Sequence, residues 1–194
     1  MPHNLRYFFL LCLMVSLGSC HSEPKVQTPP TPEASAKPAV AGQALLSNQK
    51  IVEVVLPKGW SNQLAKDDSF NLKAANASKD AYLTVQTSAK RDFPQLSLKE
   101  FARIGRKAGI PTMTDLNITG PTDVTTVNGY PAIQYQFRGK VDGIDAVLLH
   151  TAIESPNYFH QILVGASSDA FERQQKRFQS LIETFQDVSA TASK

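Results

Sequence analysis

The feature that most constrains the fold is a series of extended segments joined by very short turns within residues 116–166. Asn128-Gly129 and Asp142-Gly143 are dipeptides that favour tight hairpin turns, and "SPN" at 155–157 is a third turn signal. Because such turns are too short for a crossover, consecutive strands are expected to run antiparallel. The predicted meander consists of residues 116–126, 132–139, 144–154 and 158–166.

Three further strands are expected nearer the amino terminus. Residues 51–56, "IVEVVL", form a segment that stops at Pro57 and Gly59. Residues 69–75 are a second candidate, and residues 81–88 alternate in polarity and are rich in aromatic and β-branched side chains. These strands precede the first segment with a helical pattern.

That helix is predicted within residues 97–109, "SLKEFARIGRKAG". Ser97 is expected to be the N-cap, and Glu100 three residues later completes a capping box. Gly109 and the following Pro111 end the helix. Its apolar face consists of Leu98, Phe101, Ala102 and Gly105.

A longer helix is expected at residues 167–188. Its large apolar side chains recur at helical period, so they form a stripe that would pack on the sheet. An aromatic stripe of this kind indicates core rather than a ligand site. Its members are Phe171, Phe178, Leu181, Ile182 and Phe185.

Together these elements predict an α+β domain over residues 50–188, an antiparallel β-sheet flanked by helices. A domain of about 140 residues is large enough for a single core. Residues 189–194 are expected to be a disordered tail.

The first 19 residues have the layout of a bacterial secretory signal: a weakly positive start with Arg6, an apolar run at 7–15, then small residues. The apolar run is about half of the roughly 20 residues that a membrane-spanning helix needs. Residues 1–19 are therefore predicted to be a signal peptide.

The segment "LGS" at 17–19 runs directly into Cys20 and resembles the lipobox of bacterial lipoproteins. The resemblance implies that the Cys20 thiol receives a diacylglyceryl group, that the signal is cut before it, and that the new amino terminus is acylated. The other cysteine, Cys12, lies in the removed segment, so no intramolecular disulfide is expected. The alternative is an ordinary cleaved signal with Cys20 near the cut by chance. By the same resemblance His21, in place of aspartate, favours the outer over the inner membrane.

Residues 20–49 are rich in Pro, Ala, Ser and Thr and are predicted to be a flexible linker behind the lipid anchor. Such a chain would span roughly 30 Å as a coil and about 85 Å when extended. The linker would let the domain stand away from the membrane.

Composition excludes some classes of function. Removal of Arg6 with the signal leaves 19 Lys and Arg against 17 Asp and Glu, and this near balance does not indicate nucleic-acid binding. Common catalytic and cofactor motifs are absent from the sequence, including Gly-x-Ser-x-Gly, His-Glu-x-x-His, Gly-x-Gly-x-x-Gly and Cys-x-x-Cys. No catalytic residue, cofactor or metal is therefore predicted.

Two histidines were considered as metal ligands. His150 and His160 lie on consecutive predicted strands, and a three-residue loop would place them on one face as diagonal neighbours. No third ligand is evident, so a metal site is not predicted.

The outer face of the first helix is the candidate interaction surface, suited to anionic head groups or an acidic partner. A solvated helix face is the simpler alternative. Trp60 either lines an interface or packs over the end of the sheet. The basic residues of the candidate surface are Lys99, Arg103, Arg106 and Lys107.

The order of these segments, "LPKGW" at 56–60, "VNGYPAIQYQFRG" at 127–139 and the final aromatic helix resemble the family that groups PsbP, Mog1 and DcrB. The resemblance covers about residues 50–187 and implies an antiparallel sheet flanked by helices. It also implies binding and assembly roles rather than catalysis. Its members share no active site, so no functional residue is transferred.

Two functions are compatible with these features. The first is a non-catalytic, lipid-anchored periplasmic module that binds another envelope protein. The second is a carrier or sensor of a small apolar ligand, such as a lipid, held between the sheet and the C-terminal helix. The second predicts a cavity lined by Phe178, Leu181 and Phe185, and a fully packed core would count against it.

Overall fold

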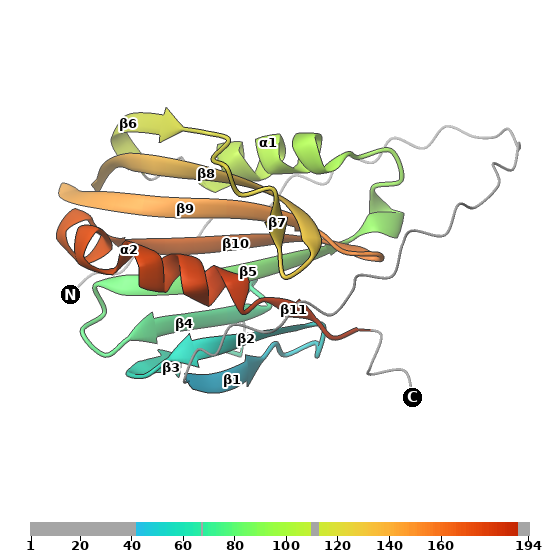
Figure 1. Cartoon of the computed structure of the whole chain (residues 1–194), viewed down its shortest axis with the longest axis horizontal. Coiled ribbons are helices and arrows are strands. Elements are labelled where there is room, and N and C mark those ends of the chain that lie inside the picture. Colours follow the sequence, from blue (N-terminus) through green and yellow to red (C-terminus); the bar gives the residue numbers. More distant parts are fainter. Residues whose placement is uncertain (1–41, 67, 110–112, 190–194) are drawn as a thin grey trace, which may run out of the picture. The chain divides into compact units, whose positions relative to one another are not determined.

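The computed structural model describes residues 42–66, 68–109 and 113–189. They form two antiparallel sheets, the 3-10 turn η1 (Lys90–Asp92) and two α-helices, α1 (Leu98–Gly109) and α2 (Ser168–Glu183) (Figure 1). Within this described part, no helix has the length and apolar character needed to cross a membrane. The strands are β1 (Gly42–Leu46), β2 (Val52–Pro57), β3 (Trp60–Asn62), β4 (Leu72–Asn76), β5 (Ala81–Ala89), β6 (Met113–Thr119), β7 (Thr126–Val127), β8 (Tyr130–Val141), β9 (Ile144–Glu154), β10 (Tyr158–Ser167) and β11 (Gln186–Asp187).

The larger sheet has the order β3-β4-β5-β10-β9-β8-β6, with the short β7 paired to β8. The part β10-β9-β8-β6 is the predicted meander, which is confirmed. The smaller sheet has the order β1-β2-β11 and joins the two ends of the described chain. The α+β class with an antiparallel sheet is therefore confirmed.

Local turn chemistry explains the hairpins of the meander. Asn128 and Gly129 have φ values of 47° and 82°, and Asp142 and Gly143 have 51° and 80°. Positive φ at both central positions is the conformation of a two-residue turn that matches the twist of the flanking strands, and Asn-Gly and Asp-Gly adopt it readily. Both predicted turns are confirmed.

The first helix begins with the predicted capping box. The backbone N–H of Ser97 donates to Glu100 Oε2 at 3.1 Å, and the backbone N–H of Glu100 donates to Ser97 Oγ at 3.3 Å. Its buried side faces β9, β8 and β10. Gly105 lies where an added Cβ would be 2.4 Å from Gln161 Oε1, so a glycine permits the close approach of α1 to the sheet.

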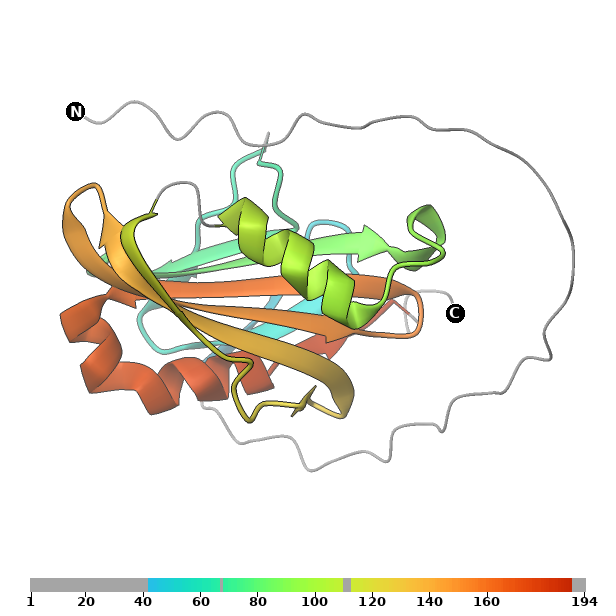
Figure 2. The same ribbon diagram turned by 90° about the horizontal axis from the view of Figure 1, so that it is seen from above.

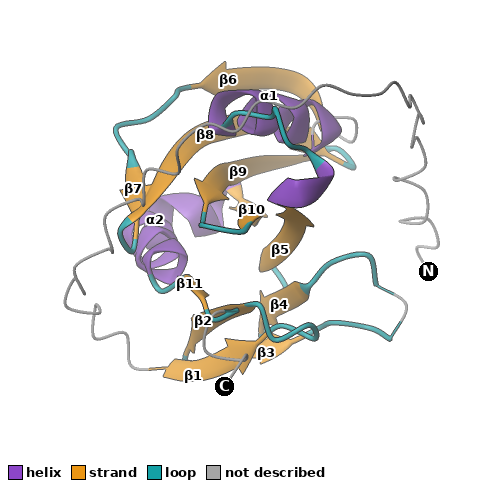
Figure 3. Cartoon of the chain, turned by 90° about the vertical axis from the view of Figure 1, so that its right-hand side faces the viewer, coloured by secondary structure: helices purple, strands orange, loops and turns teal. Residues whose placement is uncertain are grey.

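The two helices cover opposite faces of the larger sheet (Figures 2 and 3). α2 packs on β10 and β9 and also on β2 of the smaller sheet. All five residues of the predicted stripe are buried, with at most 1% of the surface of each residue exposed, so the stripe is confirmed as core. On the other face, Phe101 of α1 stacks on Phe159 with ring centres 4.8 Å apart. Each face therefore has its own apolar cluster.

The predicted boundary of the linker is wrong at its C-terminal end. β1 lies within the segment expected to be linker, and it pairs with β2 from Gly42 opposite Pro57 to Leu46 opposite Glu53. Its residues show little strand pattern and most are exposed. The strand forms because it pairs with the edge of β2, and this pairing depends on the folded structure rather than on the local sequence of β1.

Two other segments differ from expectation. The single strand predicted at 116–126 is divided into β6 and β7, with Gly120 and Pro121 between them. Proline cannot donate a ladder hydrogen bond, which explains the interruption. The final helix ends at Glu183, and β11 pairs with β2 instead of continuing the helix. The short β3 was also not predicted.

Candidate functional site

The predicted basic surface on α1 is largely available to solvent. Lys99, Arg103 and Lys107 are exposed. Arg106 is only half-exposed, because its guanidinium lies 4.7 Å from the centre of the Tyr135 ring. Ile104 is 47% exposed and lies at one side of this basic stripe, three residues from Lys107 and four from Glu100. The outer face of α1 therefore combines an apolar side chain with a basic stripe, the arrangement of many protein interfaces.

Trp60 has the packing role rather than a surface role. It is 7% exposed and meets Phe178 of α2 edge to face, with ring centres 6.4 Å apart. Phe178 also contacts Phe171 at 5.8 Å, and Phe185 lies against Tyr130 at 6.0 Å. The side chains expected to line an apolar ligand cavity are thus in contact with core rings, which counts against the ligand-carrier alternative.

The expectation that His150 and His160 share a face is wrong. His150 is opposite Leu163 and His160 is opposite Ile153, so the two histidines are three positions apart and point to opposite faces. Ser155 N–H donates to Tyr158 O at 2.9 Å, so the hairpin turn has two residues and not three. A change of one residue in the loop reverses the face of every following side chain.

His160 lies at the centre of a buried polar network on the α2 face. Its Nδ1 is 3.1 Å from Thr87 Oγ1, and its Nε2 is 3.0 Å from Ser155 Oγ and 3.7 Å from Asp187 Oδ2. Ser155 Oγ also lies 3.3 Å from the carbonyl oxygen of Tyr158 and contributes a hydrogen bond that lowers the pKa of Asp187. The network joins β5, the β9–β10 turn and β11.

Asp187 is almost buried, with 5% of its side chain exposed. Burial alone would raise the pKa of Asp187, but contacts with His160 and with Ser189 lower it well below its usual value. Burial lowers the pKa of His160, and the neighbouring carboxylate opposes that shift. The carboxylate is therefore ionised beside a neutral imidazole at pH 7.

The combination of serine, histidine and aspartate invites comparison with a hydrolytic triad. In a triad the serine and the carboxylate meet different ring nitrogens. Here Ser155 and Asp187 both approach Nε2, and Thr87 occupies Nδ1. The hydroxyl of Ser155 is also buried and directed at a carbonyl. This geometry fits a structural network and not an activated nucleophile.

His150, on the α1 face, has neither ring nitrogen in a hydrogen bond among the described residues. It lies 6.1 Å from the Phe137 ring, centre to centre. Burial lowers the pKa of His150 to about 4, and only the amide of Gln161 opposes this shift. His150 is therefore a neutral imidazole in a largely apolar layer, with the side-chain amide of Gln161 as a polar neighbour.

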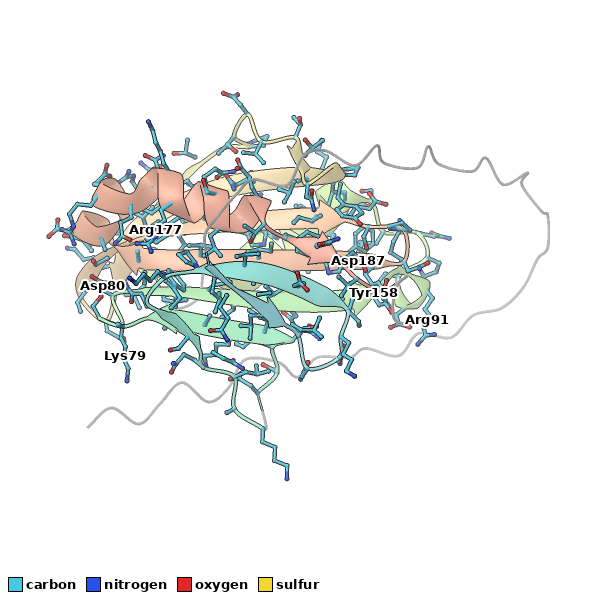
Figure 4. The ribbon with its side chains drawn as sticks, turned by 60° about the horizontal axis from the view of Figure 1, so that its bottom comes forward. Lys79, Asp80, Arg91, Tyr158, Arg177 and Asp187 are labelled. Carbon is cyan, nitrogen blue, oxygen red and sulfur yellow. The ribbon has the colours of Figure 1, made fainter. Side chains whose placement is uncertain are left out.

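A pocket of about 350 Å³ lies beside the His160 network, at the end of the domain where β5 ends and β10 begins. Lys90 is held there, because its Nζ is 2.6 Å from Glu154 Oε1 and its backbone N–H donates to Asn157 O at 2.9 Å. Arg91 has 89% of its side chain exposed, and its Nε lies 3.8 Å from Asp92 Oδ1. Figure 4 shows Arg91, Tyr158 and Asp187 toward this end. The lining residues are Ala89, Lys90, Arg91, Pro156, Asn157, Tyr158 and Ser189.

Sequence reasoning did not find this pocket or Asp187. The lining comes from three segments that are far apart in the chain, and β11 was expected to be helical. The Ser155-Pro156-Asn157 turn was the one local signal. Among the described residues, no group of three His, Cys, Asp or Glu is placed to hold a metal ion. Cys20 lies outside the described residues, so its lipidation stays a prediction.

Three solved structures share this architecture. LpqN of Mycobacterium tuberculosis, involved in cell envelope biogenesis, has a TM-score of 0.56 at 9% identity, over 74% of this chain and 88% of LpqN. The Ran-binding protein Mog1p of Saccharomyces cerevisiae has a TM-score of 0.53 at 11% identity, over 79% and 98%. Cyanobacterial PsbP of Synechocystis has a TM-score of 0.49 at 12% identity, over 80% and 98%.

The likeness to LpqN and Mog1p confirms the expected PsbP/Mog1-like α+β fold. At identities this low it concerns the fold alone. No protein-family model matches the sequence, and no curated protein matches it either.

Proposed function

We propose that this chain is a non-catalytic binding module of the bacterial envelope, anchored by lipid at Cys20, that binds another envelope protein. The observation that carries the proposal is the fold. Its structural relatives include a protein of cell envelope biogenesis, LpqN, and a Ran-binding protein, Mog1p. The lipobox-like segment before Cys20 supports export of the chain and its location in the cell envelope.

The outer face of α1 is the proposed contact surface. Ile104 would supply an apolar contact, and the adjacent stripe of Lys99, Arg103 and Lys107 would favour an acidic partner. α1 is a firm platform for such a contact, because Phe101 stacks on Phe159 beneath it. The surface is turned away from the sheet, so a partner could reach it without disturbing the core.

Site-directed photocrosslinking in cells tests this function. A photoreactive residue at Ile104 is expected to capture one envelope protein. The same residue at Ile144, in the β8–β9 hairpin and 64% exposed, is the matched control and is expected to capture none specifically. Equal capture from both positions would contradict the proposed surface.

The anchor is tested separately by labelling cells with a palmitate analogue. The natural chain should carry the label and sediment with the outer membrane, and Cys20→Ser should be unlabelled and soluble in the periplasm. Loss of the Ile104 crosslink in Cys20→Ser would show that capture depends on the anchor. A labelled Cys20→Ser protein would overturn the lipidation site.

A further inference from the structure

Five cations from three separate segments meet at the end of the domain opposite the pocket. They are Lys58 between β2 and β3, Lys79 between β4 and β5, and Arg173, Lys176 and Arg177 of α2. All five are exposed. We call this set the Lys58 surface.

Hydrogen bonds between the three segments bring them together. Arg177 Nη2 donates to the carbonyl of Lys58 at 2.9 Å, which joins α2 to the β2–β3 turn. Ser167 N–H donates to the carbonyl of Asp80 at 3.1 Å, so α2 also begins beside the β4–β5 turn. The pKa of Asp80 is lowered mainly by hydrogen bonds with Asn76 and Ser78, and the charge of Arg173 adds a smaller effect. Figure 4 shows Lys79, Asp80 and Arg177 together, away from Tyr158 and Asp187.

Helix α2 supplies three of the five positive charges of the Lys58 surface. Arg173, Lys176 and Arg177 are spaced by three and four residues, so they share a face of α2. That face is opposite the buried stripe of phenylalanines. The acidic groups nearby are Asp169 and Glu172 on the same helix, of which Glu172 is paired with Arg138 at 2.7 Å, and Asp80, which is hydrogen-bonded to Asn76 and Ser78. The Lys58 surface therefore keeps an excess of positive charge.

The chain enters the folded domain at this surface. Gly42, the first described residue, is opposite Pro57, the residue before Lys58. Residues 21–41 are thus the only chain between Cys20 and the rim of the Lys58 surface. Any force that draws the lipidated amino terminus to a bilayer draws this end of the domain with it.

We infer that the Lys58 surface binds the phosphate groups of anionic phospholipids in the membrane that holds the anchor. The inference rests on the proposed lipid anchor and deepens it, because it sets the orientation of the domain. The pocket and the start of α1 would then face away from the bilayer, toward a partner. Arg and Lys suit this task because both bind phosphate oxygens.

Vesicle flotation of residues 20–194 carrying Cys20→Ser, without the predicted signal peptide, tests the surface without the lipid. Binding to phosphatidylcholine vesicles with added phosphatidylglycerol is expected, and binding to phosphatidylcholine alone is not. Each cation near an anionic surface contributes about fivefold, so Arg173→Ala with Lys176→Ala should weaken binding about 25-fold. Arg177 is left intact because it holds the β2–β3 turn.

The matched control is Lys99→Ala with Arg103→Ala on α1, which removes the same charge from the opposite face of the sheet. It should change vesicle binding less than about twofold. Thermal unfolding of both variants checks that they fold. Equal losses in the two variants, or no binding to phosphatidylglycerol vesicles, would overturn the inference.

Failure of this inference and failure of the proposed function give different results. If vesicles are not bound but Ile104 still captures its partner, the Lys58 surface is not a lipid site and the adaptor function stands. If an acidic protein crosslinks at Lys176 while vesicles do not bind, that protein and not the membrane is the occupant. Vesicle binding without an Ile104 crosslink would support the surface and count against the adaptor.

Discussion

His160 and His150 lie on neighbouring strands and are both buried, yet the two faces of the sheet treat them differently. His160 meets Thr87, Ser155 and Asp187 on the α2 face. On the α1 face His150 lies against Phe137, neither of its ring nitrogens has a hydrogen bond of normal geometry, and the Gln161 amide is a polar neighbour. The α2 face holds the pieces of the domain together through polar and aromatic contacts, whereas the α1 face is a smaller apolar layer. Four tests probe this contrast.

The largest effect is expected from Phe178→Ala on the α2 face. Phe178 contacts Trp60 and Phe171 and is 1% exposed, so truncation leaves a cavity and should reduce the free energy of unfolding by about 4 kcal/mol. Urea unfolding measures the loss. Ile104→Ala on the outer side of α1 is the control and should change stability by less than about 0.5 kcal/mol. Similar losses in both variants would remove the contrast between the faces.

His160→Leu should cost about 3 kcal/mol, because Asp187, Ser155 and Thr87 lose a buried partner. The companion variant His150→Leu should change stability at pH 7 by less than about 1 kcal/mol, since it removes no hydrogen bond. A double-mutant cycle between His160 and Asp187 separates their coupling from the loss of packing. Equal costs for the two histidines would show that the network does not stabilise the fold.

The third test uses pH. The pKa of His150 is about 4 in the folded chain and about 6.5 when unfolded, so the unfolded state binds more protons between these values. Stability from neutral His150 is present above pH 6.5 and is lost as pH falls toward 4, by about 2 kcal/mol at pH 5. His150→Leu should reduce the slope of stability against pH in this window. An unchanged slope would assign it to other groups, of which His160 is the first.

The smallest effect concerns the cap that starts the α1 face. Ser97→Ala removes the hydroxyl that accepts from the backbone N–H of Glu100, and should cost about 1 kcal/mol. Ser97→Asp preserves an acceptor and should restore most of the loss. Both are measured by thermal unfolding. If Ser97→Ala is neutral, the layer of sheet contacts under α1 is sufficient to hold the helix without its cap.

Features that depend on residues close together in the sequence were predicted, and features that depend on distant residues were not. The turns at Asn128 and Asp142 and the capping box at Ser97 depend on side chains within three residues, and all were predicted. β1 and β11 depend on pairing with β2 from opposite ends of the chain, and neither was predicted. Local chemistry determines local structure, but an edge strand needs a partner that only the folded sheet supplies.

The candidate site shows the same limit. The α1 cations were placed correctly on an exposed helix face, because a single amphipathic pattern contains that information. The sequence predicts a three-residue loop and hence a shared face for the two histidines, whereas the turn has two residues and the histidines point to opposite faces. The pocket and the Lys58 surface each combine three distant segments, so no window of sequence contains them.

The pairing of Gly42 with Pro57 has a mechanical consequence. Tension on a lipid-tethered chain would be applied at Gly42, at the end of β1 where its pairing with β2 begins. Tension applied at this end of the pair would break the hydrogen bonds between β1 and β2 one after another, starting at Gly42 and ending at Leu46. β1 is mostly exposed and makes few core contacts, so it would peel away first and lengthen the tether. Under the proposed lipid anchor, β1 would therefore detach before tension reached β2 and the aromatic core.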